Sequence, residues 1–136
     1  MKINAYLSFN GNCETALKFY EKCLGGKIAF KMTYGESPMA KETPKELHNQ
    51  IMHARFMVGD NVLMASDNPP NRYEEPKGIS VTLNVDTAKD AECFYAGLSE
   101  KAKVTMPLQE TFWAERFAIL TDQFGTPWMI NCEKKD

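Results

Sequence analysis

The two halves of this chain repeat one another, and the repeat constrains the fold more than any other feature of the sequence. At an offset of roughly 75 residues, LKFYEKCLGGKIAF in the first half aligns with AECFYAGLSEKAKVTM in the second. The alignment places Phe19 and Tyr20 on Phe94 and Tyr95. Because one short repeat leaves an apolar face uncovered, the pattern predicts two similar modules packed together.

Each half has the pattern of a strand, a helix and three further strands. Alternating apolar residues predict strands, and an apolar stripe that ends at Gly25 and Gly26 predicts the first helix, with Asn12 as its cap. Thr87 and Asp90 form a capping box for the second helix. The predicted strands are 3–9, 27–34, 50–58, 61–66, 79–85, 102–106, 115–121 and 127–132.

The predicted fold is α+β, with two βαβββ modules that form a cupped eight-stranded mixed sheet around a cavity. The modules are expected at residues 1–70 and 78–136, joined by a linker at 71–77, within a single domain of 136 residues. Alternation along the first and fifth strands predicts that Ile3 and Ile79 pack against the helices.

Charge and composition indicate which kinds of partner and which cellular compartment to expect. The net charge is −2 and no basic stripe is present, so nucleic-acid binding is not expected. No apolar run has membrane-spanning length and the N-terminus does not resemble a secretory signal, so we expect a cytoplasmic protein with no membrane partner. The cysteines have no zinc-finger spacing and are expected to be reduced. Cys13 lies in a first helical turn, where a thiol is either activated or ordinary, whereas Cys23, Cys93 and Cys132 are expected to face the core.

Three segments carry a resemblance to a known family: YLSFNGNCETALKFYEKCLGG, MHARFMVGDNVLMASD and WAERFAILTDQFGTPWMIN. Together with the repeat, they make the chain similar to the vicinal oxygen chelate superfamily, which includes glyoxalase I, bleomycin-resistance proteins and extradiol dioxygenases, and most similar to its PhnB-like branch. The resemblance implies a glyoxalase-like fold and a homodimer. It also implies four ligand positions for a divalent metal, on the first, fourth, fifth and eighth strands.

Those four positions hold Asn4 (Tyr6 if the register shifts by one pleat), Met64, Ser80 and Met129. Divalent Mg, Mn, Ni or Zn favours imidazole and carboxylate ligands, so no metal and no cofactor are predicted, although a divalent metal held by differently registered residues is not excluded. Met64 and Met129 suit either copper(I) or the filling of a core.

His53 and Arg55 are the first candidates for a site, because alternation places them on the cavity side of their strand. His53 could act as a general base and Arg55 could hold an anionic group. The alternative is that both lie at a strand end or a dimer contact, paired with a carboxylate. Arg116 either binds a carboxylate ligand or makes a buried structural pair, with Glu115 and Asp122 nearby in sequence.

Aromatic residues and one long loop complete the candidates. Tyr6, Tyr34, Phe112 and Trp113 supply aromatic surface for a ligand, an interface or a plug over the core. The loop at 35–49 is long enough for a lid, and its His48 is expected to be solvated. The full set of ligand-binding candidates is Tyr6, Ser8, His53, Arg55, Met64, Ser80, Trp113, Arg116 and Met129.

The sequence favours a metal-free homodimer that binds a small organic molecule. One alternative is a lyase, isomerase or dioxygenase that uses His53, Tyr6 and Arg116 or an unrecognised metal. The other is a structural dimer whose cavity is filled by Met57, Met64, Met129 and Trp113.

Overall fold

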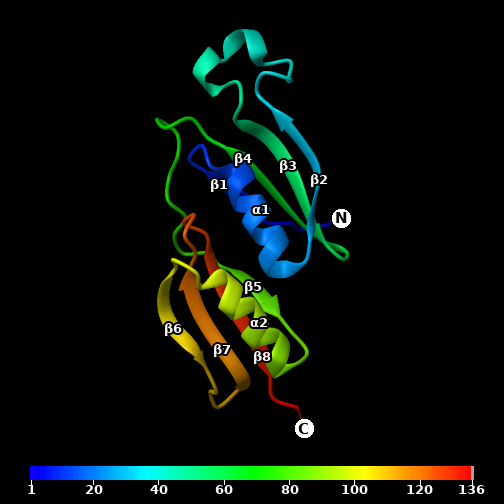
Figure 1. Ribbon diagram of the computed structural model, residues 1–136, viewed down its shortest axis with the longest axis vertical. Coiled ribbons are helices and arrows are strands. Elements are labelled where there is room, and N and C mark those ends of the chain that lie inside the picture. Colours follow the sequence, from blue (N-terminus) through cyan, green and yellow to red (C-terminus); the bar gives the residue numbers. More distant parts are fainter. Residues whose placement is uncertain (136) are drawn as a thin grey trace. The chain divides into compact units, whose positions relative to one another are not determined.

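The computed structural model describes residues 1–135 and shows two βαβββ modules in an α+β fold, as the sequence predicts (Figure 1). The chain divides into two compact modules, Met1–Glu74 and Glu75–Asp136, at a point inside the segment expected to be a linker. Each module has its own four-stranded sheet, with orders β1-β4-β3-β2 and β5-β8-β7-β6. Both sheets are mixed, because β1 pairs with β4 in parallel and β5 does so with β8, while the other pairs are antiparallel.

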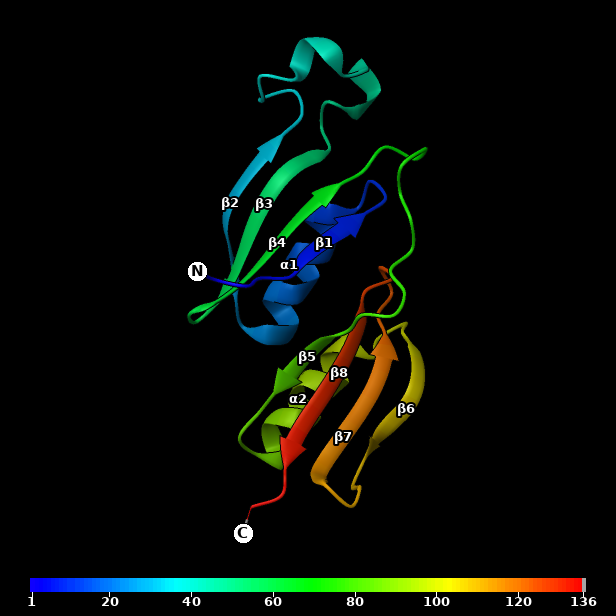
Figure 2. The same ribbon diagram turned by 180° about the vertical axis from the view of Figure 1, so that it is seen from behind.

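The first module consists of β1 (Tyr6–Phe9), α1 (Cys13–Leu24), β2 (Lys27–Thr33), β3 (Ile51–Val58) and β4 (Asn61–Asp67). Helix α1 covers one face of its sheet, and the strands lie in front of it when the molecule is viewed from behind (Figure 2). Apolar residues recur every three or four positions along α1 and meet alternate residues of the strands, which produces one core. Its buried members include Phe9, Ala16, Leu17, Tyr20, Leu24, Ala54, Phe56 and Ala65.

A buried carboxylate, rather than the expected Asn12 side chain, caps the start of α1. Asn12 makes no side-chain capping bond. Instead, Asp67 Oδ1 accepts from the backbone N–H of Cys13 at 2.9 Å, and Asp67 Oδ2 accepts from that of Ile51 at 2.8 Å. Asp67 is only 1% exposed, so one side chain at the end of β4 joins the start of α1 to the start of β3.

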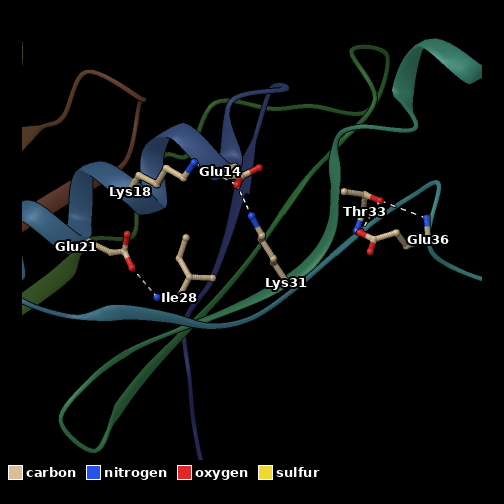
Figure 3. Close-up of polar contacts among 7 residues, drawn as sticks. All are labelled: Glu14, Lys18, Glu21, Ile28, Lys31, Thr33 and Glu36. Carbon is tan, nitrogen blue, oxygen red and sulfur yellow. Dashed lines mark hydrogen bonds and ion pairs between the residues drawn. The ribbon is translucent and has the colours of Figure 1, made fainter.

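Ion pairs and hydrogen bonds fasten the exposed side of α1 to β2 (Figure 3). The Glu14 carboxylate bonds Lys31 of β2 and also approaches Lys18 at 3.4 Å. Glu21 accepts from the backbone N–H of Ile28 at 3.0 Å. The Lys31 ammonium, as hydrogen-bond donor and counter-charge, lowers the pKa of Glu14 from its ordinary value of 4.5.

The second module consists of β5 (Val81–Asn84), α2 (Ala88–Leu98), β6 (Lys103–Gln109), β7 (Ala114–Thr121) and β8 (Pro127–Glu133). The predicted capping box is confirmed at its cap, since Thr87 Oγ1 accepts from the Asp90 N–H at 3.0 Å. Asp122 is buried and accepts from Trp128 Nε1 at 2.8 Å, which closes the β7–β8 hairpin. The buried core includes Ala91, Leu98, Ala118, Leu120, Trp128, Ile130 and Cys132.

Several expectations about the strand ends and the cysteines are wrong. Strand β1 begins at Tyr6 and β5 at Val81, so Ile3 and Ile79 precede the strands and are 90% and 78% exposed instead of packing on the helices. Strand β6 continues to Gln109, beyond the expected end of this strand at residue 106. Cys93 is exposed and Cys23 is half-buried, whereas Cys132 is buried as expected.

The segment at 35–49 is an ordered loop with two 3-10 turns, Ala40–Glu42 and Lys45–Leu47. His48 is half-buried rather than simply solvated, because its Nε2 lies 3.0 Å from the carbonyl oxygen of Ala40 and 2.9 Å from that of Thr43. Both neighbours are hydrogen-bond acceptors, so Nε2 carries the proton and donates. His48 therefore ties the two turns together.

Candidate binding site on the open face of the first module

The face of the first sheet turned away from α1, the open face, brings together the candidates that the sequence placed on β1, β3 and β4. Cross-strand partners share a face of the sheet. The registers pair Arg55 with both Met64 and Phe30, and Met64 with Tyr6, which makes one row across the sheet. His53 pairs with Met32 in the next row. Side-chain alternation also puts Ser8 on this face.

Tyr6 and His53 contact each other at the centre of the open face. The Tyr6 hydroxyl oxygen lies 3.1 Å from His53 Nδ1, which is hydrogen-bond distance. The two rings have centroids 5.8 Å apart, and the Phe30 ring lies 6.1 Å from the imidazole on the other side. Tyr6 is 50% exposed, so this cluster of rings is accessible from the open face.

Arg55 is exposed on the same face, two residues along β3 from His53. Alternate residues on a strand are about 6.7 Å apart, so both side chains can reach one small molecule. Within residues 1–135, the ion pairs engage Lys18, Lys31, Arg116 and Lys134, and Arg55 is in none of them. The carboxylate partner that the structural alternative requires for Arg55 is therefore missing from the described part of the chain.

Tyr34 and Asn68 make hydrogen bonds where β4 ends. The Tyr34 hydroxyl donates to the Asp67 carbonyl oxygen at 2.7 Å, and the Asn68 amide donates to the Ser8 hydroxyl. Burial, together with the nearby Asp67 carboxylate and the Tyr6 phenol, raises the pKa of Tyr34. The Tyr34 phenol is thus neutral and anchored to the end of β4.

The four positions expected to hold a metal carry side chains that suit a hard divalent ion poorly. Met64 lies beside Tyr6, and Met129 lies beside Thr82. Asn4 and Ser80 lie outside the strands, and the Asn4 amide donates to the Val62 carbonyl at 3.2 Å. A thioether and a phenol are poor ligands for Mg, Mn, Ni or Zn. In residues 1–135, no three His, Cys, Asp or Glu residues are grouped to hold a metal ion.

The open face of the second module has apolar and amide side chains along β7 and β8, and Lys103 joins it through its pairing with Thr121. Its cross-strand pairs join Thr82 to Met129, Ile119 to Met129 and Phe117 to Asn131. Trp113 packs against Phe117 with centroids 5.2 Å apart, and Phe112 packs on Trp113 at 4.8 Å. A shallow depression of about 370 Å³ at one end of this module is lined by Asn84, Val85, Asp86, Asn131, Glu133, Lys134 and Lys135.

Arg116 does not share either open face. It pairs with Cys132, whose side chain is buried on the helix side, and its Nε lies 3.5 Å from Glu92 Oε1 of α2. Arg116 Nη1 also donates to the Glu115 carbonyl at 2.8 Å. Of the two alternatives, the structure has an ion pair, but it is partly exposed rather than buried, with Glu92 56% exposed, and the partner is on the helix rather than nearby in sequence.

The Cys13 thiol is not activated by the start of its helix. It is completely buried, and this burial, with Asp67 and Glu14 nearby, strongly raises its pKa. A neutral thiol is a weak nucleophile, so Cys13 belongs to the core.

Two structural residues of this region were missed by reasoning from sequence. Asp67 and Asn68 follow the fourth predicted strand directly, and a short polar run at a strand end gives no sign that its carboxylate reaches another helix. The sign that α1 is capped from elsewhere is that the Asn12 side chain makes no capping bond. This is seen only in the folded structure.

Comparisons with known proteins agree with this architecture. The family model described as the Glyoxalase/Bleomycin resistance protein/Dioxygenase superfamily matches residues 2–130. Protein YjdN of Escherichia coli (strain K12) is 33% identical, over 99% of this chain and 97% of its own length.

Solved structures with the same fold include two bacterial proteins. The crystal structure of protein PA1353 from Pseudomonas aeruginosa is 46% identical, with a TM-score of 0.90 and 99% of each chain covered. The PhnB protein from Bacillus cereus has a TM-score of 0.81 at 22% identity, with 97% of this chain and 99% of that chain covered, which is a likeness of fold.

Proposed function

The chain belongs to the glyoxalase/bleomycin resistance protein/dioxygenase superfamily, and from that premise we propose that it binds a small organic anion without a metal, on the open face of its first module. The observation that carries the proposal is the exposed, unpaired Arg55 beside His53 among residues 1–135. An accessible guanidinium next to an imidazole offers charge-assisted hydrogen bonds to a carboxylate or another oxoanion.

The surroundings of Arg55 suit an anion attached to an apolar body. Phe30, Met64 and Tyr6 continue the same row across the sheet, and Phe30 and Tyr6 remain partly exposed. A ring or short alkyl chain placed over this row would cover apolar surface while its anionic group reaches Arg55. Benzoate and phenylacetate are therefore suitable first probes.

Calorimetric titration with benzoate and phenylacetate in the presence of a chelator tests the proposal. We expect binding by the wild type and about a tenfold or greater loss of affinity in R55Q, because a hydrogen bond to a charged group is removed. R116Q is the matched control, since Arg116 pairs with Glu92, and it is expected to bind like the wild type. Failure of every acid to bind, or an equal loss in both variants, would contradict the proposal.

Metal retention distinguishes the proposed function from a metal-dependent one. After dialysis against nickel, manganese, zinc and iron, we expect no stoichiometric retention, because Tyr6 and Met64 present a phenol and a thioether. Retention of one ion per chain would replace the proposed function with the metal-dependent alternative.

The contact between Tyr6 and His53 supports a second function, proton transfer to or from the bound molecule in a lyase or isomerase. The Tyr6 oxygen and His53 Nδ1 are 3.1 Å apart, which is the distance expected of an acid–base group and the residue that orients it. Turnover of a bound acid that is lost in H53Q would establish this function. Binding without turnover would support a binding protein that is not a catalyst.

We further propose a homodimer in the cytoplasm. Exposed large apolar residues, including Ile3, Ile79 and Phe112, supply surface that a partner copy could cover. The four free cysteines suit a reducing compartment. No helix in residues 1–135 is long and apolar enough to cross a membrane. Sedimentation equilibrium tests the dimer, and a monomer at micromolar concentration would exclude it.

A further inference from the structure

We propose that Tyr6 fixes His53 in the tautomer with its proton on Nε2, so that the open face presents the ligand with an N–H donor rather than a basic nitrogen. The tautomer can be tested whether or not the protein binds an anion. Only its effect on ligand binding rests on the proposed function. Its first test is made on the protein without ligand.

The geometry limits His53 to two arrangements. The Tyr6 hydroxyl lies 3.1 Å from Nδ1, and a neutral imidazole has one N–H and one lone pair. Either the hydroxyl donates to the Nδ1 lone pair, which leaves the proton on Nε2, or an Nδ1–H donates to the hydroxyl oxygen, which leaves Nε2 as a base. The hydrogen bond at one ring nitrogen sets the state of the other.

The chemistry of the two groups favours donation by Tyr6. A phenol O–H is a more acidic donor than a neutral imidazole N–H, and an imidazole nitrogen is a more basic acceptor than a phenol oxygen. The stronger donor therefore meets the stronger acceptor when the hydroxyl donates to Nδ1. Rings on two sides, Tyr6 at 5.8 Å and Phe30 at 6.1 Å, restrict rotation of the imidazole that would exchange its nitrogens.

In the described part of the chain, the hydrogen-bond partner of the His53 ring is Tyr6, and the Ser8 hydroxyl, which shares the open face, accepts from the Asn68 amide. On the open face, β2 contributes Phe30 and Met32, β4 contributes Met64, and β1 contributes Tyr6. The charged neighbour is Arg55, a cation with no acceptor atom. Lys31 pairs with Ala54 and so lies on the helix side, bonded to Glu14.

The consequence is a preference for ligands that accept hydrogen bonds. His53 Nε2–H and the Arg55 guanidinium are both donors, about 6.7 Å apart at their Cα positions. A carboxylate, carbonyl or other oxoanion satisfies both, whereas an ammonium or amide N–H finds no acceptor at either group. In a proton-transfer reaction, a neutral His53 in this tautomer would hydrogen-bond a substrate oxygen from Nε2 and would not accept a proton there.

The second histidine provides an internal standard for the test. His48 Nε2 faces the carbonyl oxygens of Ala40 and Thr43, so it must carry a proton. Nitrogen-15 shifts of the two imidazoles are measured by long-range proton–nitrogen correlation over a pH series, and the tautomers are compared where the shifts no longer change with rising pH. We expect His53 to show the same pattern as His48.

Two tyrosine variants separate the role of Tyr6 from a general change in structure. Y6F should move the His53 nitrogen shifts toward a mixture of tautomers and leave those of His48 unchanged. Y34F removes a hydroxyl that bonds the Asp67 carbonyl and should leave His53 as in the wild type. A proton on Nδ1 of His53 in the wild type, or a pattern unaffected by Y6F, would overturn the proposal.

Binding of benzoate then tests the consequence. We expect about a tenfold loss of affinity in H53F and a partial recovery in H53Q, whose side-chain amide restores a donor. If the tautomer is as proposed but no acid binds, the proposed function fails and the assignment of the proton stands. If acids bind and His53 carries its proton on Nδ1, the assignment fails and the binding function stands.

Discussion

The two modules share one architecture but carry different chemistry on their open faces. Their registers correspond: Tyr6, Met64 and Arg55 form a row in the first sheet, and Thr82, Met129 and Ile119 form the equivalent row in the second. One pleat away, His53 corresponds to Phe117. The first face thus has an imidazole beside a guanidinium where the second has Phe117 and Ile119, and the second has its own cation, Lys103, on the edge strand β6. A shared fold does not give the two faces the same chemistry.

The modules also differ in how their helices begin. Helix α2 is capped locally, by Thr87 one residue before it, whereas α1 is capped by Asp67 at the far end of β4. A local cap needs only a short motif, but a remote cap makes the helix depend on the whole sheet. The first module is therefore expected to be more sensitive to a single substitution.

The largest expected effect is that of D67A. The variant would leave the buried N–H groups of Cys13 and Ile51 without their acceptor, at a cost of about 3 kcal/mol in the free energy of unfolding. Urea unfolding followed by far-ultraviolet circular dichroism measures the change. A loss below about 1 kcal/mol would show that water replaces the carboxylate and would remove the contrast between the two helix starts.

Exchanging residues between the two open faces has the next largest effect. H53F gives the first face the residue that the second has at this position, and we expect it to lower the affinity for benzoate about tenfold with little change in stability. F117H makes the reverse change and should create no second site, because Ile119 stands where Arg55 would be needed. A second binding event in F117H would mean that an imidazole alone is enough.

A smaller effect is expected at the local cap of α2. T87A removes the hydroxyl that accepts from the Asp90 N–H at 3.0 Å, and such a change costs about 1 kcal/mol. The same urea titration used for D67A measures it. The comparison between the modules would be reversed if T87A proved more destabilising than D67A.

The smallest effect concerns the ion pair between α1 and β2. The pKa of Glu14 is lowered in the folded protein, so the stability it contributes is present above its ordinary value of 4.5 and is lost as the pH falls through the folded value. The pKa of Lys31 is raised from 10.5, so its contribution is lost only as the pH rises above that value. E14Q should cost less than about 1 kcal/mol at pH 7, because the pair is partly exposed.

Urea titrations of the wild type and E14Q at several pH values measure the contribution of Glu14 to the free energy of unfolding. The difference between the two proteins should shrink as the pH falls below 4.5. A difference that stays constant down to pH 2 would show that Glu14 stabilises α1 by packing or helix propensity instead of charge.

The fold could be predicted from the sequence because its signals are local and repeated. Alternation along β3 placed Ala54 and Phe56 on the helix side and His53 and Arg55 on the other, as the structure has them. The strand ends were harder, because Ile3 and Ile79 continue the alternation beyond the last residues that pair. Alternation shows which residues suit a strand, but the strand itself ends where its hydrogen-bonded partner strand ends.

The candidate site was predicted in part for the same reason. Tyr6, His53 and Arg55 share a face through alternation, which the sequence displays. The partners of Arg116 and Asp67 depend on tertiary contacts with Glu92 of α2 and with the start of α1, and no spacing in the sequence reports such contacts. Burial likewise raises the pKa of the Cys13 thiol, although a position at the start of a helix favours the thiolate.

The most direct test of the central claim is a titration of the nitrogen-15-labelled protein with benzoate in the presence of a chelator, followed by amide chemical shifts. The account predicts saturable shifts concentrated at Phe30, His53, Arg55 and Met64 in the first module, and much weaker shifts in R55Q. Shifts centred on Thr82, Phe117 and Met129, or shifts that appear only after a divalent metal is added, would contradict it.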